Sequence, residues 1–389
     1  MLEIVALAAG LAASPSSPLV PPSELESIEE ELLRDAAPAP ASPPAAGRQG
    51  AGPDISLTFD GAVAAFSQAE PPQTGNHDPR RPGFNFQQLE LGIEAPVDPY
   101  FAFKSFTVFS QFGVEVEEAY VTTLELPFNL QARAGQFLTR FGRINATHPH
   151  TWDFADQTLV IGKFMGAEGN RGMGAEAAWL APLPWFVEAI GSLTDAAGEA
   201  TARSFYGATD LGVRSPLDLQ ATGALRQFFP LGPDWSLAWG LSAANGPNPS
   251  GRSNRTDILG TDLYLKYRPL EPGAEHAFHL TVETIQRRRQ YPGTLLADTG
   301  AYAAAVWRFD RQWDAGIRLD AVEGVSGDPL DPDWSRTRYR GAASLTHRPS
   351  EFSRLRLQGS ADYPQWRDPV YAAFLALEVT VGAHGAHAF

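Results

Sequence analysis

The stretch YAAFLALEVTVGAHGAHAF, residues 371–389, decides the fold of this chain. Read at every second position, it separates into an apolar face and a face of small or polar residues. The apolar face holds Leu375, Leu377, Val379 and Val381, and the other face holds Ala376, Glu378, Thr380 and Gly382. A β-strand points successive side chains to opposite faces, so the stretch predicts an amphipathic strand. The rest of the chain decides whether this strand belongs to a soluble β-sandwich or to a membrane barrel.

The composition of the chain limits the fold classes and partners that are possible. With 389 residues the chain can form one large domain or two or three ordinary ones. It contains no cysteine, so neither a disulfide framework nor a thiolate metal site is predicted. The net charge of −15 argues against general binding to nucleic acid. No apolar run reaches the roughly 18 residues that a transmembrane helix needs. If this chain crosses a membrane, it therefore does so as a closed β-barrel.

Two segments precede the first predicted strand. Residues 1–13 contain a short apolar run that suits the core of a signal peptide, although Glu3 stands where a basic residue is usual. A disordered apolar end is the alternative. Residues 14–53 contain a short acidic helix from Ser23 to Asp35, followed by a linker rich in Pro and Ala. We expect this helix and linker to lie in the periplasm.

Residues 54–389 alternate strand-like runs with short and long connections. About sixteen runs, each close to the roughly 9–11 residues that span a bilayer, predict an all-β, antiparallel, up-and-down transmembrane barrel. Tight turns and long loops alternate, as at the two rims of such a barrel, and residues 245–256 and 290–299 are among the predicted long loops. Most strands that follow a short turn begin with an aromatic residue suited to the bilayer interface: Tyr100, Phe128, Trp185, Trp235, Trp313 and Phe352.

Within the predicted strands, one parity is apolar and the other is polar, which separates a lipid face from a lumenal face. The predicted pore-lining residues are Arg287, Arg318, Arg338, Arg340, Arg354, Arg356, Lys266, Glu90, Glu94 and Glu283. Because sequential strands are neighbours in space, the arginines form one basic wall. We expect most of this wall to face the acidic residues across the lumen, which favours anions. The alternative is that Arg and Glu pair and hold a closed barrel.

A long loop follows the fifth predicted strand, at residues 142–171, and carries His148, His150 and Asp153. Imidazole and carboxylate groups are zinc ligands in proteins. These three residues are therefore a candidate metal site with zinc as the candidate ion, and a hydrogen-bonded structural role is the alternative. No other cofactor is predicted.

Seven segments carry a family resemblance: PDISL at 53–57, EEAYV at 117–121, LP at 126–127, GQFLTRFGR at 135–143, HPHTWDF at 148–154, SEFSRLRLQ at 350–358 and GAHGAHAF at 382–389. They resemble the Gram-negative outer-membrane β-barrels labelled zinc-regulated TonB-dependent outer-membrane receptors. The glycine–aromatic piece also resembles, more faintly, phosphate-selective porins of the O and P type. The resemblance implies an outer-membrane location, a link to zinc supply, a loop after the fifth strand that folds into the barrel, and an assembly signal at the terminal Phe389.

These features together predict a passive outer-membrane channel for small hydrophilic solutes, with a preference for anions. The alternative is a zinc-linked outer-membrane receptor or metal uptake barrel that uses the histidines of the long loop. No Gly-x-Ser-x-Gly elbow or other catalytic constellation is present, so an enzyme is not predicted. The expected partners are outer-membrane lipid, small hydrophilic solutes and, through Phe389, the barrel assembly machinery. Self-association into a homo-oligomer is compatible with this prediction, and a nucleic-acid partner is not expected.

Overall fold

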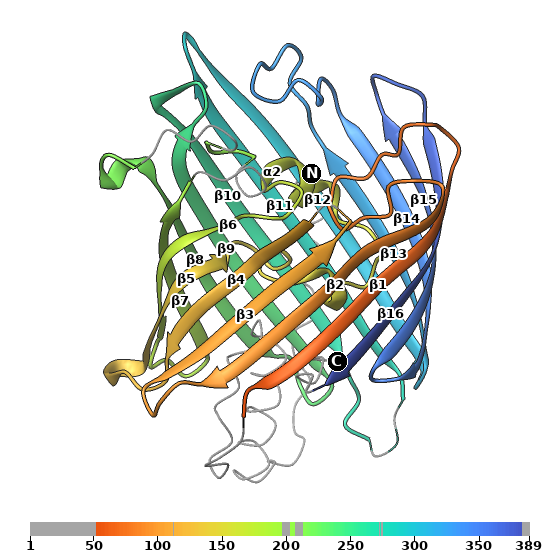
Figure 1. The fold of residues 1–389 in the computed structure, drawn as a ribbon, viewed down its shortest axis with the longest axis horizontal. Coiled ribbons are helices and arrows are strands. Elements are labelled where there is room, and N and C mark those ends of the chain that lie inside the picture. The colour runs from red at the N-terminus through yellow and green to blue at the C-terminus, as the bar shows by residue number, and fades with distance from the viewer. Residues whose placement is uncertain are drawn as a thin grey trace.

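The computed structural model describes residues 52–111, 113–196, 203–206, 213–271, 273 and 275–382. Within these residues, sixteen antiparallel strands close into one barrel, in which each strand pairs with its sequence neighbours and β1 pairs with β16 (Figure 1). The predicted all-β barrel is confirmed. Its strands are β1 (Asp54–Phe66), β2 (Gly83–Pro96), β3 (Phe101–Ser110), β4 (Gly113–Thr123), β5 (Leu130–Leu138), β6 (Arg171–Leu180), β7 (Phe186–Asp195), β8 (Leu219–Pro230), β9 (Trp235–Asn248), β10 (Gly251–Tyr267), β11 (Ala277–Tyr291), β12 (Thr294–Asp310), β13 (Trp313–Val322), β14 (Arg338–Ser350), β15 (Ser353–Pro364) and β16 (Val370–Gly382).

The barrel wall is apolar outside and polar inside, as the period of two predicts. In β13, Ile317 and Leu319 are 61% and 65% exposed, whereas Arg318 between them is 1% exposed. In the closing strand β16, Leu375 and Leu377 likewise point outward, while Phe374 and Ala376 beside them are buried. The aromatic residues that begin strands after short turns are all exposed, as interfacial anchors need to be: Tyr100, Phe128, Trp185, Trp235, Trp313 and Phe352.

Two connections differ from the prediction. The sequence predicts long loops at 245–256 and 290–299, but the strands β9–β10 and β11–β12 continue through both segments to tight turns. β11 ends at Tyr291 and β12 begins at Thr294, with Gly293 at φ +80° in the turn between them. Glycine adopts this conformation without steric cost. Polar residues in these segments pair in register across the hairpin, so polarity alone does not mark the end of a strand.

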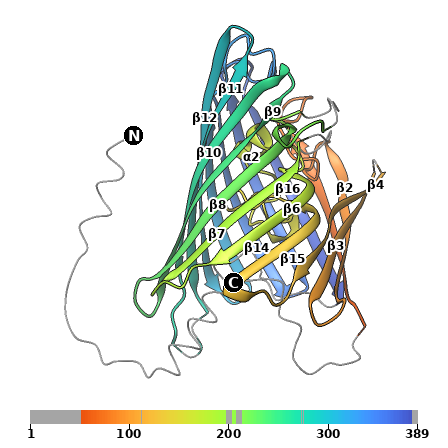
Figure 2. The same ribbon diagram turned by 90° about the vertical axis from the view of Figure 1, so that its left-hand side faces the viewer.

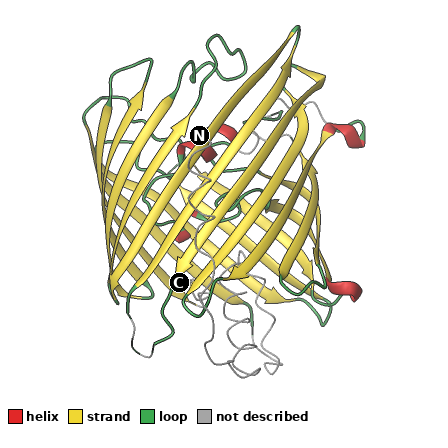
Figure 3. Ribbon diagram, turned by 180° about the vertical axis from the view of Figure 1, so that it is seen from behind, coloured by secondary structure: helices red, strands yellow, loops and turns green. Residues whose placement is uncertain are grey.

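The connection between β5 and β6, residues 139–170, folds into the barrel, and we call it the inner loop. It contains η3 (Pro149–Thr151) and α2 (Leu159–Phe164). Figures 1 to 3 show α2 enclosed by the ring of strands. Two further 3-10 turns, η2 (Pro127–Asn129) and η4 (Pro216–Asp218), lead into β5 and β8. The inward fold of this loop is the arrangement that the family resemblance implies.

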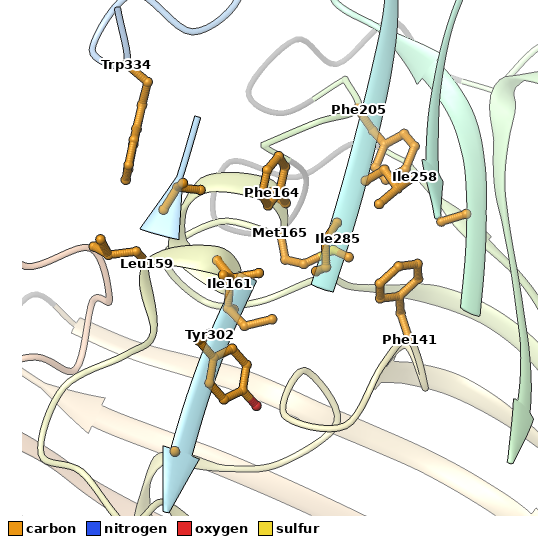
Figure 4. Close-up of a cluster of buried hydrophobic side chains, with 14 of the residues drawn as sticks. Phe141, Leu159, Ile161, Phe164, Met165, Phe205, Ile258, Ile285, Tyr302 and Trp334 are labelled. Carbon is orange, nitrogen blue, oxygen red and sulfur yellow. The ribbon is translucent and has the colours of Figure 1, made fainter. Parts of the chain in front are cut away.

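The main hydrophobic cluster lies inside the barrel, between the inner loop and the wall. Phe141, Leu159, Ile161 and Phe164 of the inner loop are at most 1% exposed and pack with wall residues such as Ile285 (Figure 4). Because burial of large apolar side chains is the main favourable term in packing, this cluster stabilises the loop in its inward position. The loop therefore fills part of the lumen with packed side chains.

Several predicted features lie outside the described residues: the signal-like segment 1–13, the helix within 14–53 and the terminal Phe389. Of the barrel predicted at 54–389, the described strands cover Asp54 to Gly382. Among the helices of the described residues, none is long and apolar enough to cross a bilayer.

Candidate functional site

The arginines predicted to line the pore point inward, but carboxylates neutralise all of them locally except Arg356. Arg287 on β11 lies opposite Asp298 on β12, and Arg340 on β14 lies opposite Asp362 on β15. Nε of Arg340 donates to Asp362 Oδ2 at 2.8 Å, and Nε of Arg338 donates to Asp362 Oδ1 at 2.9 Å. The predicted basic wall that faces its acidic partners only across the lumen is therefore wrong, because neighbouring strands place opposite charges in direct cross-strand pairs.

Asp156 of the inner loop joins two of these arginines. Its Oδ1 accepts a hydrogen bond from Nη2 of Arg318 at 3.0 Å, and its Oδ2 accepts one from Nη1 of Arg340 at 2.9 Å. The side-chain amide of Gln358 adds a third bond at 2.6 Å. Burial raises the pKa of Asp156, but the two guanidiniums lower it by a larger amount, so the pKa lies below its usual value. Asp156 is therefore a charged attachment point between the inner loop and the wall.

Lys163 in α2 is a second attachment point and is fully buried. Its Nζ lies 3.1 Å from a carboxylate oxygen of Asp298 and 3.1 Å from one of Asp331. Arg287 also contacts both carboxylates, with its Nη2 3.0 Å from Asp331 Oδ2. Burial raises the pKa of Asp331, but Lys163, Arg203 and Arg287 lower it below its usual value. α2 is thus held by a compact group of ion pairs.

Arg354 and Arg356 on β15 hold the earlier part of the inner loop. Arg354 forms an ion pair with Glu378 on β16 and donates to the carbonyl of Trp152 at 2.9 Å. Arg356 donates to the same carbonyl at 2.9 Å. A small space open to solvent lies beside these two arginines. It is also lined by Asp60, His77, Asp78, Gln87, Pro149, Trp152, Phe154, Ala155, Ala376, Leu377 and Glu378.

The histidines of the inner loop meet the acidic side of the interior. Nδ1 of His148 lies 3.0 Å from Oε2 of Glu117 and 3.2 Å from Oε2 of Glu90, and its Nε2 lies 2.9 Å from Oε2 of Glu118. Nδ1 of His150 lies 3.2 Å from Oε1 of Glu90. Burial lowers the pKa of His148, but the surrounding carboxylates raise it well above its usual value.

The connection between β1 and β2, residues 67–82, brings another histidine to the same place, and we call it the first loop. Nε2 of His77 lies 3.1 Å from Oε1 of Glu117 and 2.9 Å from Oε2 of Glu168. Each carboxylate oxygen of Glu117 therefore faces a different histidine. Two sets in the described residues have ligand atoms close enough together for a metal ion: His77 with Glu117 and Glu168, and His148 with Glu90 and Glu117.

Asp153 does not join this group. The sequence analysis places it with His148 and His150 in one candidate metal site, but its Oδ2 lies 3.0 Å from Nε2 of His279 on β11. Neither Asp153 nor His150 belongs to the two sets with metal-ligand spacing. The three-residue set predicted from the sequence is not assembled, because spacing along a loop does not fix which wall residues its side chains reach.

The remaining predicted lining residues, Glu94, Lys266 and Glu283, lie on the strands of the wall, and Glu283 also contacts the inner loop. Glu94 pairs with Lys104 of the neighbouring strand at 2.5 Å. Lys266 is buried. Glu283 is fully buried and accepts a hydrogen bond from the backbone of Arg143 at 3.4 Å. Gly142 makes this approach feasible, because a Cβ at its position would stand 1.8 Å from Glu283 Oε1 and its φ is +61°.

The sequence alone does not predict the carboxylates that neutralise the arginines. Asp298 and Asp362 lie on strands, opposite arginines, so strand parity combined with register could have found them. Asp156 and Asp331 lie in loops, where no periodic signal indicates the direction of a side chain. Glu117 and Glu118 likewise meet His148, and Glu117 and Glu168 meet His77, only through the inward folding of two loops.

No protein-family profile matches the chain. A curated protein of Aquifex aeolicus (strain VF5), described as uncharacterized, is 32% identical over 340 residues, which are 79% of this chain and 70% of that protein. The chain belongs to the same family as that protein.

Solved structures with a similar fold include an outer-membrane channel and a porin. The barrel matches OprB of Pseudomonas putida with a TM-score of 0.59 at 11% identity, over 92% of this chain and 97% of that one. It matches DcaP of Acinetobacter baumannii with a TM-score of 0.58 at 12% identity, over 86% and 99%. It matches an anion-selective porin of Comamonas acidovorans with a TM-score of 0.55 at 11% identity, over 85% and 99%. The fold is that of porin-type barrels. The resemblance to TonB-dependent receptors gains no support, since barrels of that class have about 22 strands.

Proposed function

We propose that this member of the Aquifex protein's family is a porin-like channel of the bacterial outer membrane for passive diffusion of small hydrophilic solutes. The observation that carries the proposal is a closed sixteen-stranded barrel with an apolar exterior, a charged interior and a loop that narrows the lumen from within. Barrels of sixteen or more strands enclose an aqueous channel in known proteins. We infer that the packed inner loop makes this channel narrow and that solutes pass beside β15 and β16, and the space bordered by Arg354, Arg356 and Glu378 supports this route.

The ion preference of this channel is the finer part of the proposal. The space beside the inner loop is lined by Arg354 and Arg356 and by the carboxylates of Asp60, Asp78 and Glu378. Arg354 is paired with Glu378, whereas Arg356 donates to a neutral carbonyl. A preference for anions would therefore rest on Arg356 rather than on the whole set of arginines, because a paired charge contributes little field at a distance.

Single-channel recording tests the proposal. The full chain, refolded into lipid, is expected to show discrete conductance steps in a planar bilayer, and proteoliposomes containing it should take up small sugars but exclude larger ones. A variant in which residues 146–166 are replaced by a short Gly-Ser linker should show larger steps. Heat-dependent migration in gels confirms that each barrel is folded. Absence of conductance from the folded wild type and from the folded loop variant would contradict the channel. Chemical crosslinking in the same vesicles tests for self-association.

A further inference from the structure

Four glutamates meet three histidines where the first loop and the inner loop both touch the wall. Glu90 on β2 and Glu117 on β4 are 2% and 5% exposed. The ion pairs that these two carboxylates form are with histidines: His77 of the first loop and His148 and His150 of the inner loop. Asp156, Asp362 and Asp298, which are also buried in this interior, are paired with arginine or lysine instead. The cluster therefore differs in its cationic partners from the ion pairs on the arginine side of the lumen.

The ring of His148 carries too few N–H groups to form a good hydrogen bond with every carboxylate around it. Its Nδ1 lies within 3.2 Å of oxygens from both Glu90 and Glu117, yet one N–H can serve only one of them well. Oε2 of Glu90 is buried and has no hydrogen-bond partner. With Nε2 donating to Glu118 at 2.9 Å, release of the Nδ1 proton to make room for an incoming ion would leave a lone pair directed toward Glu90 and Glu117. A metal-bound histidine has this arrangement, with a carboxylate on the far nitrogen and the near nitrogen on the ion.

His77 lies on the other side of Glu117 and meets carboxylates through Nε2 alone, because its Nδ1 is buried and has no hydrogen-bond partner. Its Nε2 faces Oε1 of Glu117 at 3.1 Å and Oε2 of Glu168 at 2.9 Å, so this nitrogen also meets two carboxylates. The carboxylate of Glu117 thus presents one oxygen to each histidine. A carboxylate in this position can bridge two metal ions, as glutamates do in the dinuclear sites of some helical proteins.

The charge balance of the cluster favours a cation. Glu90, Glu117, Glu118 and Glu168 carry four negative charges when ionised, whereas the three histidines His77, His148 and His150 supply at most three positive charges. Lys104 on the next strand pairs with Glu94 instead. Excess negative charge is costly in a buried site unless a cation compensates it.

We propose that this cluster binds divalent transition-metal ions at two adjacent positions bridged by Glu117. One position is formed by His77, Glu117 and Glu168, and the other by Glu90, Glu117 and His148, whose ring Glu118 orients. The ligand atoms of each set lie within 4.8 Å of one another, so small movements would bring them to coordination distance. Mixed imidazole and carboxylate ligands suit ions such as Zn²⁺ and Mn²⁺. The space beside the inner loop reaches His77 and gives the ions an entry route.

Bound metal would fasten both loops to the wall. The ligands come from β2, β4, the first loop and the inner loop, so an ion at this place joins four separate segments of the chain. The effect on conductance rests on the proposed channel function, whereas the binding itself does not. Metal binding without conductance would support the metal site and contradict the channel. Conductance without metal binding would support the channel and contradict the metal site.

Calorimetry with Zn²⁺ and Mn²⁺ on the refolded full chain, after treatment with a chelator, tests the site. The wild type should bind two ions per chain. Glu117→Gln should lose both, because both positions share this carboxylate, and His148→Gln should lose one. Asp153→Asn is the matched control: it alters another lumenal contact between a carboxylate and a histidine, outside the cluster, and should still bind two ions.

Two outcomes would overturn the proposal: no binding by the folded wild type, or wild-type binding by Glu117→Gln. Loss of binding in the Asp153→Asn control would also overturn it, since the ions would then lie elsewhere. If Glu117→Gln does not fold, as judged by heat-dependent gel migration, His77→Gln and His148→Gln decide the question, each with an expected stoichiometry of one. Electron paramagnetic resonance of bound Mn²⁺ separates a bridged pair, whose ions are magnetically coupled, from two isolated ions.

Discussion

The two sides of the barrel interior hold the inner loop by different chemistry. On the side of β11 to β15, arginines and Lys163 bind aspartates of the loops and of neighbouring strands. On the side of β2 and β4, glutamates bind His77, His148 and His150. Arginine stays charged at any working pH, whereas a histidine binds a carboxylate strongly only when a proton or a metal ion is present.

This difference separates a permanent attachment from a conditional one. The arginine side keeps the inner loop inside the barrel under all ordinary conditions. The histidine side depends on what the solution supplies, and it also holds the first loop. Loosening it would change the lumen near β2 to β4 without releasing α2, which lies against β11, β12 and β13. Substitutions on each side test whether the two attachments are independent.

The largest effect is expected from Asp156→Ala on the arginine side. This change leaves the buried guanidiniums of Arg318 and Arg340 without their shared loop carboxylate. Removing one partner of a buried ion pair typically costs about 3–5 kcal/mol, because a charge remains buried without full compensation. Urea unfolding in lipid vesicles measures the loss, and single-channel recording should show larger and noisier steps.

The matched control for this substitution is Glu351→Gln, which removes one carboxylate from an exposed turn between β14 and β15. It should change the free energy of unfolding by less than about 0.5 kcal/mol. Equal stability of Asp156→Ala and the control would show that the inner loop does not depend on its arginine attachment.

The sequence predicted the wall of this molecule better than its interior contacts. The alternation of Ile317, Arg318 and Leu319 is a local pattern that can be read from the sequence. Because side chains of a strand alternate between its two faces, this pattern specifies which residues point inward. The inward direction of Arg340 follows from the same pattern. Its pairing with Asp362 needs the register of two strands, and its pairing with Asp156 needs the path of a 32-residue loop, residues 139–170. No repeat in the sequence encodes that path, so the candidate metal set was predicted with Asp153 instead of Glu117.

A smaller effect is expected on the ion preference of the channel. Arg356 and Arg340 differ in whether a carboxylate neutralises their charge. Arg356→Ala should shift the reversal potential under a salt gradient toward cations, because Arg356 borders the open space and donates to a neutral carbonyl. Arg340→Ala should destabilise the barrel but leave the reversal potential nearly unchanged, because Asp156 and Asp362 neutralise this charge. A larger shift from Arg340→Ala than from Arg356→Ala would restore the idea of one continuous basic wall.

The smallest effect is expected from the pair of Asp153 and His279, which lies outside both attachments. Their side chains are 33% and 24% exposed, and ion pairs with this access to water contribute about 0–1 kcal/mol. Burial raises the pKa of Asp153, but the interaction with His279 lowers it by a larger amount, so the pKa lies below its usual value. A carboxyl group with a lowered pKa stabilises the folded state above its unfolded pKa of about 3.9, and this contribution is lost as the pH falls below that value. Asp153→Asn should therefore be slightly less stable than the wild type near neutral pH, and the two should converge in acid. A loss above about 2 kcal/mol, or a difference that grows as the pH falls, would show that this pair is a third attachment of the inner loop.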